Sequence, residues 1–132
     1  MYRGVQSAGP IAPGYAAPRS IALATAYQAL NPLRPALVVL TFSVPATLLL
    51  SAGTTVTGDV RIGADASVAT GGGVLVAPYK KSLTGVLGVG VSLATDDYET
   101  KTFLLPANAY FAVRQLSGAG MLVVSASEQA IN

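Results

Sequence analysis

Short runs of alternating apolar side chains, separated by turn-forming residues, constrain this sequence most. From Ser20 onwards Val, Ile, Leu, Thr and Tyr dominate, and Gly, Pro, Asn or Asp interrupts them about every 8 to 12 residues. Residues 36–44 show the pattern clearly, with Val38, Leu40 and Phe42 on one face. An alternation with a period of two residues indicates β-strands that each bury one face. The sequence therefore predicts an all-β protein.

Eight or nine short strands and their turns can be placed along the chain. Besides 36–44, we expect strands at 20–25, 47–51, 56–62, 67–70, 85–94, 101–105, 110–116 and 121–127, whereas 25–30 could form one helical turn. Turns are expected at 71–73 and 96–97. The predicted fold is an antiparallel β-sandwich, jelly-roll-like, with little helix. The predicted core comprises Val38, Leu40, Phe42, Leu87, Val89, Val91, Phe111 and Val113.

Residues 1–19 differ from the rest of the chain and predict an extended N-terminal arm. They contain three prolines and three glycines and show no strand or helix period. Residues 20–132 then form the β-sandwich domain. The arm is either a disordered terminus or a segment that lies along a neighbouring subunit. In the second case its partner-binding residues are Tyr2, Arg3, Val5, Ile11, Tyr15 and Arg19.

The composition argues against catalysis. The chain has no Cys, His or Trp, which removes thiol nucleophiles, imidazole bases, Ser-His-Asp triads and Cys/His zinc sites. The carboxylates lack the spacing of a calcium loop and are expected to be solvated, with Asp59 on a polar strand face and residues 96–99 in an acidic turn. The glycine-rich stretches lack the features of a phosphate loop. We therefore expect no enzyme activity, no metal and no cofactor.

The charge pattern also limits the choice of partner. Only 11% of the residues are charged, against about 25% in an average protein, so we expect a partner to cover part of the surface. Arg3, Arg19 and Arg34 precede the first acid but are too sparse for nucleic-acid binding. Lys80 and Lys81 mark either a solvated loop or an edge strand guarded against aggregation.

Residues 35–53 are uncharged and long enough to span a bilayer. However, Pro45 interrupts them, and similar apolar runs occur elsewhere in the chain. The N-terminus also lacks the order of basic, apolar and small residues that marks a signal peptide. We therefore expect no membrane insertion.

Several strand-and-turn phrases in this sequence resemble a family of small structural proteins of tailed bacteriophages. The resemblance covers 20–129 but not the arm. It rests on Ser20-Ile21, Thr25-Ala26-Tyr27-Gln28-Ala29, Asn31-Pro32, Arg34-Pro35-Ala36, Val60-Arg61-Ile62-Gly63, Ser82-Leu83-Thr84-Gly85, Leu105-Pro106-Ala107 and Tyr110-Phe111-Ala112-Val113-Arg114.

The resemblance implies a virion β-sandwich with no active-site residues. The expected function is that of a capsid decoration or cement protein, which binds the major capsid protein on the capsid exterior and stabilises it. The resemblance also implies a homo-oligomer, either a dimer or a trimer, made in the host cytoplasm. The alternative is a tail, baseplate or fibre module that binds a host-surface glycan.

Overall fold

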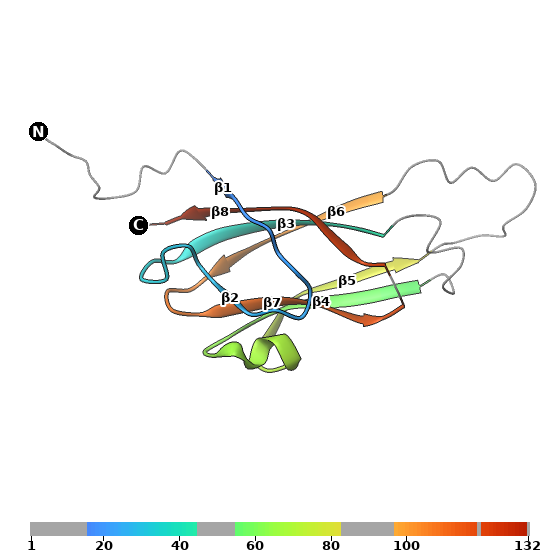
Figure 1. Ribbon diagram of the computed structural model, residues 1–132, viewed down its shortest axis with the longest axis horizontal. Coiled ribbons are helices and arrows are strands. Elements are labelled where there is room, and N and C mark those ends of the chain that lie inside the picture. Colours follow the sequence, from blue (N-terminus) through green and yellow to red (C-terminus); the bar gives the residue numbers. More distant parts are fainter. Residues whose placement is uncertain (1–15, 45–54, 83–96, 119, 132) are drawn as a thin grey trace, which may run out of the picture.

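The computed structural model describes residues 16–44, 55–82, 97–118 and 120–131, which form two four-stranded antiparallel sheets. The first sheet has the strand order β1-β8-β3-β6 and the second β2-β7-β4-β5 (Figure 1). The strands are β1 (Ala17–Pro18), β2 (Tyr27–Gln28), β3 (Ala36–Val44), β4 (Thr55–Gly63), β5 (Val74–Ser82), β6 (Asp97–Leu105), β7 (Tyr110–Ser117) and β8 (Leu122–Ala130). The prediction of an all-β protein is confirmed.

The two sheets form layers that share one apolar core, so the arrangement is sandwich-like (Figure 1). Phe42 of β3 lies 5.2 Å from Tyr79 of β5, measured between ring centroids. Phe103 of β6 meets Phe111 of β7 edge to face, with centroids 5.5 Å apart. Both contacts join one sheet to the other, in the geometry that aromatic pairs favour.

The predicted core is confirmed where the structure describes it. The side chains buried as expected are Val38, Leu40, Phe42, Phe111 and Val113. The other three predicted core residues, Leu87, Val89 and Val91, lie outside the described residues, as do the strands expected at 47–51 and 85–94.

The predictions for residues 20–30 are wrong. Residues 20–25 form no strand, and Tyr27 and Gln28 form β2 instead of a helical turn. The chain here crosses from the first sheet to the second. Arg19 N–H donates to Ala126 O of β8 (2.9 Å), and Ala24 N–H donates to Val113 O of β7 (2.7 Å). Because it crosses between the layers, the segment cannot pair continuously with either sheet.

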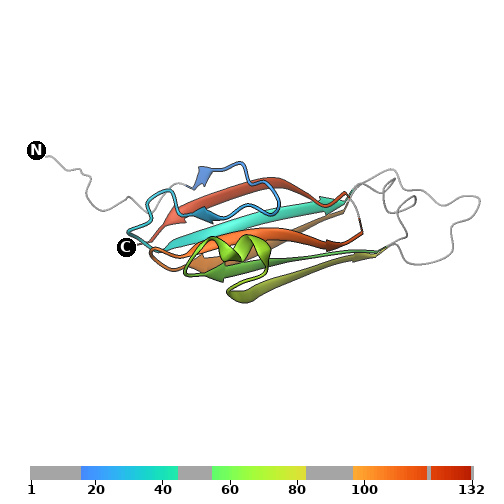
Figure 2. The same ribbon diagram turned by 60° about the horizontal axis from the view of Figure 1, so that its bottom comes forward.

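The strand expected at 67–70 is also wrong, because residues Ala66–Thr70 form a 3-10 helix, η1. Asp65 begins this helix by accepting the Ser67 N–H, and Gly71 ends it with a positive φ of 107°. Glycine is the residue that adopts this backbone conformation most easily. Figure 2 shows η1 in front of the second sheet. The turn expected at 71–73 is confirmed at this position.

Two further differences concern the strands on either side of 83–96. No strand is predicted at 74–82, where the structure has β5. As an edge strand, β5 tolerates a proline. Asp97 begins β6 and does not form a turn.

Candidate functional site

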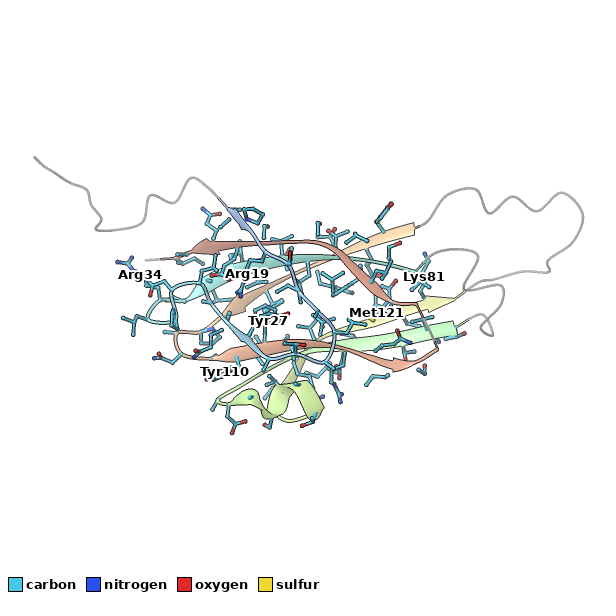
Figure 3. All side chains as sticks on the ribbon, viewed as in Figure 1. Arg19, Tyr27, Arg34, Lys81, Tyr110 and Met121 are labelled. Atoms are coloured by element: carbon cyan, nitrogen blue, oxygen red, sulfur yellow. The ribbon has the colours of Figure 1, made fainter. Side chains whose placement is uncertain are left out.

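Residues 19–26, which cross from the first sheet to the second, form the crossing segment. A buried ion pair between Arg19 and Glu128 fixes this segment to the sheets. Arg19 Nη1 donates to Glu128 Oε1 (2.7 Å) and to the backbone oxygen of Gln28 (2.7 Å). The other carboxylate oxygen accepts the Leu30 N–H at 2.5 Å. The Arg19 guanidinium also lies 5.4 Å from the centre of the Tyr27 ring (Figure 3). This cluster, the crossing lock, ties β1, β2 and β8 together.

Arg19 is the predicted arm residue that the structure describes. The sequence places it among the residues by which the arm could bind a partner, and in the structure its guanidinium pairs with Glu128 of its own chain. Only 13% of its side chain is exposed. Tyr2, Arg3, Val5, Ile11 and Tyr15 lie outside the described residues. The folded body includes β1, so it begins before Ser20.

A second charged cluster lies on the outer side of the second sheet, next to η1. Asp59 of β4 accepts two hydrogen bonds from Arg114 of β7, at 2.9 and 2.7 Å. Arg61 donates to the backbone oxygens of Gly72 (2.9 Å) and Gly73 (3.0 Å) in the turn that follows η1. This cluster, the helix lock, holds the η1 turn against the sheet.

The prediction of solvated carboxylates is wrong for Asp59 and Glu128, since both are buried. Asp59 was assigned correctly to a polar strand face, but the sequence did not indicate that η1 and two arginines would cover that face. The hydrogen bond to Asp59 raises the pKa of the Arg114 guanidinium. A raised pKa keeps Arg114 charged, as arginine is generally.

The other charged residues of the described ranges lie mainly on edge strands. Glu99 and Lys101 form an ion pair on β6. Lys80 and Lys81 lie on β5, the edge of the second sheet, so the edge-strand interpretation of this lysine pair is confirmed. Lysine, proline and inward-facing charges on an edge strand oppose pairing with another chain.

The outer face of the first sheet is different, because none of the outward-facing residues that the structure describes there is charged. The outward positions of β3, β6 and β8 are those opposite in parity to the buried core residues of these strands, except at the Leu122 end of β8, where a register shift opposite Thr41 and Phe42 reverses the parity. We call this surface the hydroxyl face, and it comprises Leu37, Val39, Thr41, Tyr98, Thr100, Thr102, Leu104, Leu122, Ser125, Ser127 and Gln129; Ser43, at the end of the same row of β3, is buried.

The rows of the hydroxyl face follow from the strand register. Thr41 lies between Thr100 and Ser125, and its Oγ1 is 3.1 Å from that of Thr100. Apolar and aromatic side chains lie towards the ends of the strands, where Leu104 and Tyr98 are exposed. The sequence showed the alternation in β3 but not which strands lie beside it, so this surface could not be predicted.

Within the described ranges, the structure contains no group of three or more acidic residues that could hold a metal ion. The acidic stretch 96–99 is divided: Asp96 lies outside these ranges, and Glu99 is paired with Lys101. No helix in the same ranges is long and apolar enough to span a bilayer.

Comparison with protein-family models, with curated proteins and with solved structures gave no match for this chain.

Proposed function

We propose that this protein is a structural component of a tailed-bacteriophage virion, most specifically a capsid decoration or cement protein. It lies on the capsid exterior, binds the major capsid protein and bridges neighbouring capsid subunits. We further propose that the two sheets are the layers of a jelly-roll-like β-sandwich, from which the N-terminal arm extends. The protein is made in the host cytoplasm and joins the particle there.

The proposal rests on one observation, which is where the charged residues lie in the fold. Two ion pairs lie inside the folded body. The pair Arg19–Glu128 holds the crossing segment against the sheets, and the pair Arg114–Asp59 lies in the cluster that holds η1 there. One broad sheet face is uncharged and exposed at many positions. This distribution suits a rigid building block whose surface is covered in an assembly. The family resemblance over 20–129 supports the same proposal.

In this proposal the arm supplies the attachment to the capsid. Tyr2, Val5, Ile11 and Tyr15 provide spaced apolar contacts, and Arg3 pairs with a carboxylate of the capsid subunit. Arg19 anchors the base of the arm through Glu128. Prolines restrict the free arm, so that less conformational entropy is lost when the arm binds.

Deleting residues 1–15 tests this attachment. Full-length and truncated proteins are added to particles that lack the protein, and bound protein is measured after sedimentation. The truncated protein should keep its melting temperature, since β1 begins at Ala17. It should bind at least about tenfold more weakly. Equal binding of the two proteins would contradict the role of the arm.

The second candidate is a tail, baseplate or fibre module that binds a host-surface glycan. One observation favours it: Tyr98 is 65% exposed and lies on an uncharged, hydroxyl-rich face, and sugar rings stack on exposed aromatic side chains. Tyr79 cannot play this part, because it is buried in the core. Binding to purified host-surface glycan that is abolished by Tyr98→Ala would favour this candidate over the first.

A further inference from the structure

We propose that the hydroxyl face binds the hydroxyl face of a second copy of this chain, so that two first sheets pack face to face in a homodimer. This inference rests on the proposed function, since it assigns the surface through which the decoration protein associates with itself.

The chemistry of the face favours a copy of itself over other partners. A hydroxyl group both donates and accepts hydrogen bonds, so Thr100, Thr102 and Ser125 can pair with the same residue types. A two-fold interface brings the same patch of both chains together. With no charge among its outward residues, the face meets no like charge in its copy. An acidic or basic partner would find no counter-charge there.

Two features elsewhere on the described surface oppose self-association. On the second sheet η1 and its charged cluster cover part of the outer face. Both long edge strands carry features that oppose sheet extension: Pro78 and Lys80 on β5, and the Glu99–Lys101 pair on β6. Face-to-face packing of the first sheet meets neither of these obstacles.

The size of the face predicts a weak dimer in solution. Three long strands spaced about 4.8 Å apart, each about 30 Å long, present roughly 400 Å² in projection. A standard interface buries about 800 Å² on each partner, so the dimer lies at the weak end of specific association. On a particle, where the arm also binds, the two contacts reinforce each other.

A charge swap at Ser125, an exposed residue in the middle row of the face, tests the proposal. Sedimentation equilibrium of the full-length protein should show a reversible dimer up to high micromolar concentration. Ser125→Lys alone and Ser125→Glu alone should each weaken the dimer at least about tenfold. An equimolar mixture of the two variants should restore it. Thr70→Lys and Thr70→Glu, on η1 above the other sheet, are the matched controls and should leave the dimer unchanged.

Several results would overturn the proposal. They are a wild-type protein that stays monomeric at all concentrations, Ser125 variants that dimerise like the wild type, or a mixture that fails to restore the dimer. If the Ser125 variants do not fold, the same swap at Thr102 replaces them. A monomer that still decorates particles would refute this dimer but leave the proposed function intact. A dimer that binds no particle would do the reverse.

Discussion

Asp59 and Glu128 are buried carboxylates, and each is paired with an arginine. Burying a carboxylate is unfavourable unless other groups replace the hydrogen bonds it made with water. Arg114 supplies two such bonds to Asp59, and Arg19 and the Leu30 N–H supply them to Glu128. Removing one partner leaves the other charge buried and unpaired, which makes these pairs sensitive to substitution.

Replacing Asp59 by Asn should lower the free energy of unfolding by about 2 kcal/mol, because two hydrogen bonds from Arg114 lose their charged acceptor. The loss stays below that of a fully buried pair, since 20% of the Arg114 side chain is exposed. Urea denaturation measures it. Glu99→Gln breaks the more exposed pair with Lys101 and is the matched control, with an expected loss below about 1 kcal/mol. Equal losses for the two variants would contradict the helix lock.

Asp65 gives a prediction about pH. Hydrogen bonds from Ser67, whose N–H lies 2.9 Å from Oδ1, lower the pKa of Asp65 below its ordinary value of 3.8. A lowered pKa in the folded state means that ionised Asp65 stabilises the fold above pH 3.8, and that this contribution disappears as the pH falls through the lowered pKa. Asp65→Asn keeps an oxygen acceptor but cannot ionise.

The melting temperatures of wild type and Asp65→Asn should therefore differ at neutral pH, with the wild type higher, and converge in strong acid. Other acids titrate equally in both proteins, so the difference isolates Asp65. A gap that stays constant with pH would mean that the cap works without its charge.

At the scale of elements, alternation was sufficient to predict β3, β4, β7, β8 and the second half of β6, because apolar side chains recur there at every second position. Alternation gave the wrong prediction in two places, where a segment crosses between the sheets and where a strand lies at a sheet edge. Residues 19–26 alternate like a strand but cross between layers. β5 lies at an edge, where proline is tolerated. Which strands are neighbours depends on long-range pairing, so neither the helix lock nor the hydroxyl face could be found from local pattern.

The crossing lock gives a prediction about an element. Arg19→Met keeps much of the apolar contact with Tyr27 but leaves Glu128 with the Leu30 N–H as its remaining partner in the lock. The free energy of unfolding should fall by about 3 kcal/mol. Hydrogen exchange should increase most at the amides of residue 19, Ala24 and Leu30, because the crossing opens before the sheets do.

A double-mutant cycle with Glu128→Gln supplies the control for the crossing lock. The coupling energy between the two positions should be at least about 1 kcal/mol. Strictly additive losses would show that the ion pair does not hold the crossing.

At the scale of the whole molecule, one apolar core joins the two sheets, and Phe111 lies at its centre in contact with Tyr27 and Phe103. Phe111→Ala should lower the free energy of unfolding by about 3–5 kcal/mol, because a fully buried ring is removed. Tyr98→Ala removes an aromatic ring that is 65% exposed and should cost far less. A loss below about 1 kcal/mol at Phe111 would mean that the two sheets do not share a core.

The proposed function places the protein on the capsid surface and not on the tail. In the function proposed above, the arm attaches the folded body to the particle, and the hydroxyl face pairs it with a copy of itself. A decoration protein must be present in hundreds of copies over the shell, whereas a tail or fibre module is present in a few dozen copies or fewer.

The most direct test is to count and locate this chain in native particles from the host that carries the gene, by quantitative mass spectrometry and by gold-labelled antibody in the electron microscope. We expect hundreds of copies per particle, with label distributed over the capsid surface. A few dozen copies with label confined to the tail, or particles that contain none of the chain, would contradict it.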